Sequence, residues 1–199
     1  MALKVCVVGS PSCRKSTVCD AVNVNLKMRG IKSEVVKEYA REYIDTIGLP
    51  KEPWEQVLIY EGQKAREDAV VKSGKDVVLC DSATFLNMIY LCQMLNNQDK
   101  TSANLNLQQH MYRKYLNGFL DYDIIFYAPT VGENIKDGTR VQTDSERIVI
   151  SELIKSFMDL HGVKYITLPE EFQKRLFLIE FLILNKLHQL KDWEFSASE

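Results

Sequence analysis

Residues 9–17, Gly-Ser-Pro-Ser-Cys-Arg-Lys-Ser-Thr, constrain the fold of this chain more than any other stretch of its sequence. They follow an apolar run at residues 5–8 and precede residues 18–28, whose apolar spacing predicts an amphipathic helix ending at Gly30. A strand, a tight loop and a helix N-terminus form the setting in which the pattern Gly-x-x-x-x-Gly-Lys-[Ser/Thr] binds phosphate. Backbone N–H groups and the helix dipole both favour an anion there. The sequence therefore predicts a phosphate-binding loop of the Walker A type.

The positions of this loop have expected roles in binding ATP and magnesium. Lys15 is expected to reach the β- and γ-phosphates, and the Ser16 hydroxyl is expected to ligate Mg²⁺. The candidate nucleotide-binding residues of the loop are Gly9, Ser10, Pro11, Ser12, Cys13, Arg14, Lys15, Ser16 and Thr17.

One residue departs from the pattern, because Arg14 stands where the second glycine is expected. A glycine there adopts backbone angles that other residues reach only with strain, of about 1–3 kcal/mol. The guanidinium of Arg14 either turns to solvent or adds a cation beside the nucleotide. A chance match to the motif is the remaining alternative.

Length and charge limit the possible organisation and partners. A chain of 199 residues suits one well-buried domain, so we expect a single domain over residues 1–199. The formal net charge of −2 supplies no bulk field to recruit nucleic acid or an anionic membrane. Neither a signal peptide nor a membrane-spanning stretch is apparent. We therefore expect a cytoplasmic protein without a membrane partner.

Charged side chains follow the second predicted strand, residues 31–36. Glu38 and Arg41 are expected at the carboxyl edge of the sheet, where open α/β folds bind ligands. A carboxylate there can orient or deprotonate a substrate hydroxyl, and an arginine can hold a phosphate or a ring. The alternative is the charged, solvated start of a helix.

Another acid ends the apolar run at residues 76–81, which is typical of a buried parallel strand. Asp81 in this position is expected to associate with magnesium. The alternative is that Asp81 and Ser82 cap the next helix. The preceding helix, residues 54–72, has a charged face that we expect to be solvated, formed by Glu61, Lys64, Arg66, Glu67 and Lys72.

A glycine-bearing segment, with the lid placed at about residues 129–147, lacks apolar periodicity. A lid of this kind excludes water and brings cations to a transferring phosphoryl group. Arg140 and Arg147 are the candidates, and ordinary surface arginines are the alternative. The following helix is expected to begin at a cap formed by Asp144 or Ser145.

The remaining elements complete an alternation of strands and helices. The apolar positions at residues 176–184 exceed one helical stripe, so burial explains part of them and a homodimer through this helix would explain the rest. We expect helices at residues 84–95, 107–119 and 170–190, strands at 123–127 and 163–168, and a surface loop at 96–106. This alternation predicts an α/β fold with a single doubly wound, five-stranded parallel sheet.

Several motifs occur in the order found in small P-loop kinases. They are the phosphate loop, residues 38–43 (Glu-Tyr-Ala-Arg-Glu-Tyr), the strand ending in Asp81, residues 137–140 (Asp-Gly-Thr-Arg) with the arginine that follows at 147, and residues 174–178 (Lys-Arg-Leu-Phe-Leu). The chain resembles the ribosylnicotinamide kinase domain of the bifunctional bacterial NAD-biosynthesis regulator over nearly its whole length. The second and fourth motifs are the more specific part of this resemblance.

The resemblance implies transfer of the γ-phosphate of Mg-ATP to a hydroxyl group of a nucleoside-like substrate. It implies that Ser16 and Asp81 place magnesium, and that Glu38 or Asp81 takes the hydroxyl proton. It further implies that Arg41 orients the substrate, that Arg140 and Arg147 close over the transferring group, and that Arg175 lies near the adenine. Arg14 departs from this family as well.

The acceptor is open between two classes. It is either a small molecule like ribosylnicotinamide or a hydroxymethylpyrimidine in phage DNA, and the balanced charge favours the small molecule. The aromatic residues that can stack on a base or pyridine ring are Tyr39, Tyr43, Trp54 and Tyr60. A different class of function is a nucleotide-binding or partner-binding module with weak or no catalysis, because Arg14 replaces the loop glycine.

Overall fold

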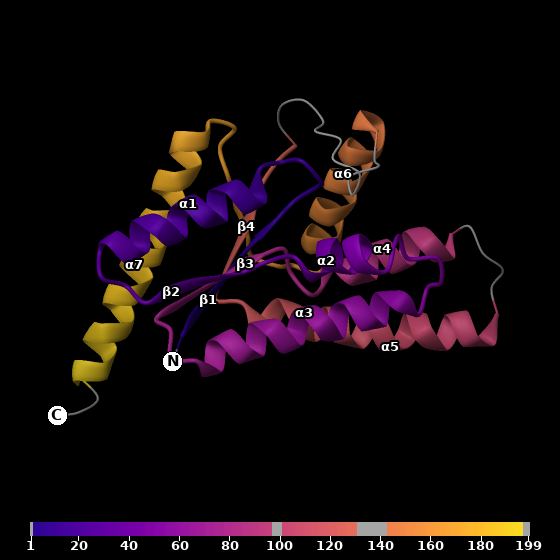
Figure 1. Ribbon diagram of the computed structural model, residues 1–199, viewed down its shortest axis with the longest axis horizontal. Helices are drawn as coiled ribbons and strands as arrows, with labels where there is room; N and C mark the ends of the chain where they lie inside the picture. The colour runs from indigo at the N-terminus through magenta and orange to yellow at the C-terminus, as the bar shows by residue number, and fades with distance from the viewer. Residues whose placement is uncertain (1, 97–100, 131–142, 197–199) are drawn as a thin grey trace.

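The computed structural model describes residues 2–96, 101–130 and 143–196. Its strands form one parallel sheet in the order β2-β3-β1-β4-β5, so β1 lies at the centre (Figure 1). The strands are β1 (Leu3–Val8), β2 (Ser33–Val36), β3 (Val77–Asp81), β4 (Ile124–Tyr127) and β5 (Ile166–Thr167). The predicted five-stranded parallel sheet of an α/β fold is therefore confirmed.

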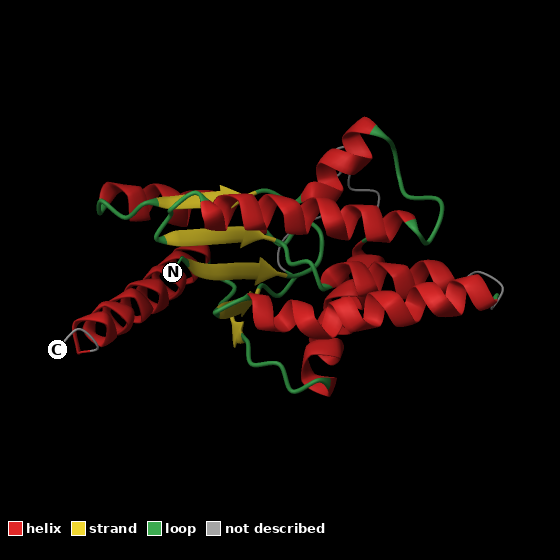
Figure 2. Cartoon of the chain, turned by 90° about the horizontal axis from the view of Figure 1, so that it is seen from below, coloured by secondary structure: helices red, strands yellow, loops and turns green. Residues whose placement is uncertain are grey.

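Helices cover both faces of this sheet (Figures 1 and 2). The helices are α1 (Lys15–Met28), α2 (Tyr39–Thr46), α3 (Glu55–Lys72), α4 (Leu86–Leu95), α5 (Ser102–Gly118), the 3-10 turn η1 (Phe119–Asp121), α6 (Asp144–Leu160) and α7 (Phe172–Ser196). Helices α1 and α7 pack together on one face, and α3, α4, α5 and α6 pack on the other. None of the described helices has the length and apolar character needed to cross a membrane.

Strand β1 is buried on both faces, which explains its apolar run from Val5 to Val8. Leu3, Val5 and Val7 join the core under α1 and α7, whereas Cys6 and Val8 join the core under α3 and α4. The alternation follows from the two-residue period of a strand. The end of β1 is thus fixed between two cores, and the loop that follows begins from a rigid point.

Two predicted boundaries are wrong because of helix capping. Residues 101–106 are not a loop, since the Thr101 side chain accepts a hydrogen bond from the backbone N–H of Asn104 and starts α5. The cap of α6 is Thr143, rather than Asp144 or Ser145, because Thr143 forms a reciprocal capping box with Glu146.

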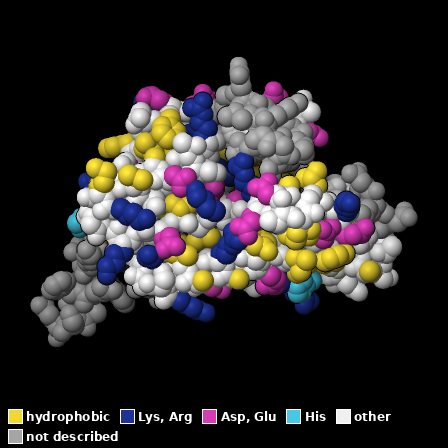
Figure 3. Space-filling view, in the orientation of Figure 1, with side chains coloured by type: hydrophobic (Ala, Val, Ile, Leu, Met, Phe, Trp, Pro, Cys, Tyr) yellow, Lys and Arg dark blue, Asp and Glu magenta, His cyan; other side chains and the backbone are white. Residues whose placement is uncertain are grey.

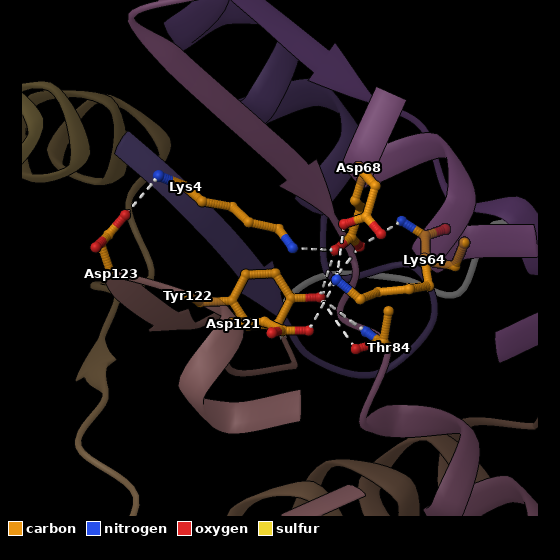
Figure 4. Close-up of polar contacts among 9 residues, drawn as sticks. Lys4, Lys64, Asp68, Thr84, Asp121, Tyr122 and Asp123 are labelled. Carbon is orange, nitrogen blue, oxygen red and sulfur yellow. Dashed lines mark hydrogen bonds and ion pairs between the residues drawn. The ribbon is translucent and has the colours of Figure 1, made fainter. Parts of the chain in front are cut away.

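The expectation of a fully solvated charged face on α3 is wrong for Glu67, which is completely buried. Its carboxylate accepts hydrogen bonds from the Tyr122 hydroxyl at 3.0 and 3.1 Å and from Gln63 Nε2 at 2.9 Å, and it pairs with Lys4 Nζ at 2.8 Å. Tyr122 also accepts from the backbone N–H of Thr84 at 2.9 Å, as Figure 4 shows. The network thereby connects β1 and α3 to the loop that follows β3.

The C-terminal helix exposes part of its apolar surface. Ile179 and Ile183 of α7 are buried against α1 and the sheet, while Phe177 and Phe181 are exposed and stack with ring centroids 5.9 Å apart. Burial against the sheet therefore explains part of the apolar run. The homodimer stays a prediction.

We expect Lys4→Met to lower the free energy of unfolding by about 3–5 kcal/mol, because it leaves the buried Glu67 carboxylate without its cation. Chemical denaturation monitored by circular dichroism measures this loss. Lys32→Met, at an exposed position before β2, is the matched control and should change stability by less than about 0.5 kcal/mol. Equal effects of the two substitutions would contradict the role assigned to the buried pair.

Candidate functional site

The phosphate loop lies between β1 and α1, as the sequence predicts. Gly9 is required there, because a Cβ atom at this position would lie 2.4 Å from the Ala128 carbonyl oxygen and 2.9 Å from Cys13 Sγ. Ser12 and Arg14 have positive φ angles of 60° and 67°, in the left-handed region. Left-handed residues within a loop turn successive backbone N–H groups toward a common anion position.

Arg14 therefore adopts the conformation that the expected glycine would adopt. The cost for a residue with a side chain is about 1–2 kcal/mol. Its side chain is exposed and lies at the wall of the main cavity, and its carbonyl oxygen accepts the hydrogen bond from the N–H of Val18 that begins α1. The substitution thus leaves the strand, loop and helix arrangement in place.

Lys15 is buried within the loop. Its ammonium group donates to the carbonyl oxygens of Gly9 and Ser10, both at 3.0 Å. Burial acts to lower the pKa of Lys15, but Cys13, Glu38 and Asp81 outweigh it and raise the pKa above its ordinary value. The loop therefore holds a permanent positive charge at neutral pH.

Asp81 lies at the end of β3, beside Val7 of β1. Its side chain is only 2% exposed, and its Oδ1 atom has no hydrogen-bond partner in the described chain. A buried carboxylate oxygen without a partner is costly, and a cation would satisfy it. Asp81 and Ser16 both line a small cavity of about 330 Å³ together with Glu38 and Arg41.

This arrangement fits a magnesium ion shared with phosphates. Within the described ranges no three His, Cys, Asp or Glu side chains gather as a metal-binding cluster. Mg²⁺ held by one carboxylate, a hydroxyl, water and substrate phosphates needs no such cluster. The unpartnered Oδ1 of Asp81 and the hydroxyl of Ser16 are candidate oxygen ligands for this ion.

The main cavity, of about 460 Å³, lies between the phosphate loop and helices α2, α3 and α4. Glu38 and Arg41 line both this cavity and the smaller one, so they lie where the two cavities adjoin. Sequence reasoning missed the polar residues on the far wall, which are Gln56, Asn87, Tyr90 and Gln93. Three of them, Asn87, Tyr90 and Gln93, recur at every third position of the otherwise apolar helix α4, and this spacing could have identified them from the sequence.

The far wall presents amide groups in an apolar surrounding. Asn87 Nδ2 donates to Gln56 Oε1 at 3.2 Å, and Ile59, Leu86 and Met94 supply apolar surface beside them. Burial, followed by the charge of Glu38, raises the pKa of Tyr90 to about 12. At neutral pH this wall is therefore uncharged and rich in hydrogen-bonding groups.

The four aromatic residues proposed to stack on a ring do not line the cavity. The Tyr43 hydroxyl instead donates to Glu55 Oε1 at 2.7 Å, and this hydrogen bond raises the pKa of Tyr43 to about 12. Among the described residues, the tyrosine that lines this cavity is Tyr90. Substrate binding by Tyr43 has no support from its position.

Two predicted arginines lie behind the phosphate loop. Arg147 of α6 and Arg175 of α7 are both 1% exposed, so neither is an ordinary surface residue. Arg147 donates to the carbonyl oxygens of Pro11 and Ser12, and Arg175 donates to that of Cys13. Arg140 lies outside the described residues.

Comparisons with known proteins agree with this geometry. A sequence model of a protein family described as an AAA domain matches residues 4–175. A search of curated protein sequences gives no significant match.

Two solved structures have folds similar to that of this chain. One is described as NadR protein in complex with NR, with a TM-score of 0.67 and 21% identity over 85% of this chain. The chain spans 46% of that protein, about half its length. The other is deoxyadenosine kinase from M. mycoides with bound dATP, with a TM-score of 0.58 and 16% identity over 94% of this chain and 99% of that one. At these identities the likeness establishes the fold, which is that of P-loop kinases.

We expect Asp81→Asn to weaken magnesium-dependent nucleotide binding without destabilising the fold, because the substitution keeps the size of the side chain and replaces a carboxylate whose Oδ1 accepts no hydrogen bond. The Mg²⁺ concentration for half-maximal thermal stabilisation by ATP should rise about tenfold or more, the scale of one lost interaction with a charged group. Differential scanning fluorimetry measures this concentration. Asp20→Asn, on the exposed side of α1, should leave it unchanged, and an unchanged value for Asp81→Asn would exclude Asp81 from the metal site.

Proposed function

We propose that this chain, which belongs to the AAA domain family, is an ATP-dependent kinase acting on a hydroxyl group of a nucleoside-like small molecule. One observation carries the proposal: Glu38 and the phosphate loop border a single cavity of about 460 Å³, on whose wall the polar amides also lie. Cavities of about 300–1,000 Å³ bind small molecules and cofactors.

The nucleotide side is assigned to the phosphate loop. Its backbone N–H groups and Lys15 would hold the phosphates of ATP, and Asp81 with Ser16 would hold Mg²⁺. The metal ion would offset negative charge on the β- and γ-phosphates. Because phosphoryl transfer depends mainly on position and electrostatics, the fixed ammonium group of Lys15 is the principal contribution of this side.

The acceptor side is assigned to Glu38 and Arg41. The acceptor oxygen attacks the γ-phosphorus, the bond from that phosphorus to the β–γ bridging oxygen breaks, and ADP leaves. Glu38 takes the proton of the acceptor hydroxyl, a role it suits better than Asp81 because Glu38 lines the main cavity and Asp81 lines only the smaller one. Arg41 orients the acceptor at the same edge.

The cavity favours a small acceptor over a base in DNA. Gln56, Asn87 and Gln93 offer donors and acceptors suited to an amide or the edge of a heteroaromatic base. On the face seen in Figure 3, Lys and Arg side chains alternate with Asp and Glu side chains rather than forming a continuous basic track. The two similar structures contain NR and dATP, respectively, as bound ligands, which also favours a nucleoside-like substrate.

The replacement of the loop glycine by Arg14 supports a second candidate function. A nucleotide-binding or partner-binding module would need the phosphate loop but not Glu38, and the arginine in place of the loop glycine is the observation that favours it. The two candidates differ in phosphate transfer. Transfer of labelled phosphate from ATP to ribosylnicotinamide, to deoxynucleosides and to hydroxymethylated DNA separates the kinase from the module, and separates the acceptor classes from one another.

We expect the chain to phosphorylate a member of the small-molecule group, and Glu38→Gln to lower kcat about 10²–10⁴-fold, because the acceptor hydroxyl loses its general base. The affinity for ATP should stay within about twofold, since Glu38 is not part of the phosphate loop. Glu52→Gln, at an exposed position before α3, is the matched control. A Glu38→Gln variant with unaltered kcat would remove Glu38 from the mechanism.

A further inference from the structure

Arg175 is a buried cation whose hydrogen bonds go to main-chain carbonyl groups. Its guanidinium donates from Nη1 to the carbonyl of Cys13 at 2.7 Å, from Nε to that of Pro169 at 2.6 Å and from Nη2 to that of Pro129 at 3.3 Å. These three acceptors belong to the phosphate loop, the segment after β5 and the segment after β4. One side chain therefore joins three segments that follow the carboxyl ends of neighbouring strands.

Arg147 contacts the same loop from another helix. Its Nε donates to the carbonyl of Pro11 at 3.0 Å, and its Nη2 donates to that of Ser12 at 3.5 Å. Its Nη1 pairs with Asp144 at 2.8 Å, one turn earlier in α6. The two arginines together bind the carbonyl groups of three consecutive residues, 11, 12 and 13.

The geometry of the peptide bond means that these contacts also determine the direction of the backbone N–H groups of the loop. In a trans peptide the C=O of one residue and the N–H of the next point in opposite directions. Carbonyl groups held by arginines at residues 11, 12 and 13 therefore direct the N–H groups of Ser12, Cys13 and Arg14 away from the arginines. Residues 11–17 line the main cavity and the two arginines do not, so N–H groups directed away from the arginines are directed toward the side where phosphate would bind.

Such support matters in this loop because its backbone is strained. Ser12 and Arg14 both have left-handed φ angles without being glycine. Conformations of this kind persist when surrounding contacts over-determine them. The arginines supply these contacts in a geometry that lysine cannot reproduce, since guanidinium presents several donors in a rigid plane and lysine a single point charge.

We propose that Arg147 and Arg175 are positioning residues for the phosphates of the nucleotide: they hold the outer carbonyl groups of the phosphate loop so that its N–H groups face the cavity. The proposal rests on the assignment of ATP to this loop and adds how the loop is held in its binding conformation. Neither arginine needs to touch the nucleotide. Their buried positive charges also favour an anion on the opposite side of the loop.

The test measures ATP affinity and fold stability separately. Arg175→Lys, Arg175→Met, Arg147→Lys and Arg147→Met are compared with the unaltered chain by calorimetric titration with Mg-ATP and by thermal unfolding. The controls Lys174→Met and Lys155→Met remove exposed cations from the same two helices. Where phosphate transfer is detected, KM for ATP and KM for the acceptor are measured as well.

We expect the folded lysine variants to bind Mg-ATP at least about tenfold more weakly, the scale of one lost charged hydrogen bond, with the methionine variants weaker still. KM for the acceptor should stay unchanged, and the two controls should bind ATP normally. A purely structural role would lower the unfolding temperature and leave the ATP affinity of the folded protein unaltered.

Two results would overturn the proposal with the kinase assignment intact: folded variants that bind ATP as tightly as the unaltered chain, or failure of all four variants to fold, which would assign the arginines to stability alone. An unaltered chain that binds no ATP would overturn both proposals. An unaltered chain that binds ATP but phosphorylates no acceptor would overturn the kinase assignment, and the binding data would still support the positioning role.

Discussion

The conformation of the phosphate loop is the constraint on which the rest of the site depends. The loop leaves the central strand, passes through left-handed Ser12 and Arg14 and enters α1 at Lys15. Its start is fixed because β1 is buried on both faces, and its close contact with the Ala128 carbonyl leaves room for no side chain at position 9. The buried ammonium group of Lys15 then fixes the charge within the loop.

The parallel sheet brings the other functional groups to this loop. Because all strands run in one direction, Asp81 after β3 and Glu38 after β2 meet at the edge where β1 ends. The hydrogen bond from the backbone N–H of Thr84 to the Tyr122 hydroxyl links the segment that follows Asp81 to the buried carboxylate of Glu67. As a result, Glu38 and Arg41 line both the main cavity beside the phosphate loop and the smaller cavity beside Asp81.

Sequence patterns predicted the order of strands and helices and the place of the loop between β1 and α1, because strand periodicity and the loop motif depend on local spacing. They failed where a residue's environment is set by distant segments. Glu67 was expected in solvent because the sequence around it does not show its ion-pair partner, Lys4, which lies on the distant strand β1. The amide groups of Gln56 and Asn87 come together only when α3 packs on α4. The contact of Arg147 with Pro11 joins residues 136 positions apart, which no local pattern encodes.

We propose that this loop binds Mg-ATP although an arginine stands in the position of the glycine. Calorimetric titration of Mg-ATP into the unaltered chain and into Arg14→Gly tests it most directly. Since Arg14 already adopts the left-handed conformation, we predict that both bind, with affinities within about tenfold of one another, the scale of the strain involved. Binding by Arg14→Gly alone would contradict the account and show that the arginine disables the loop.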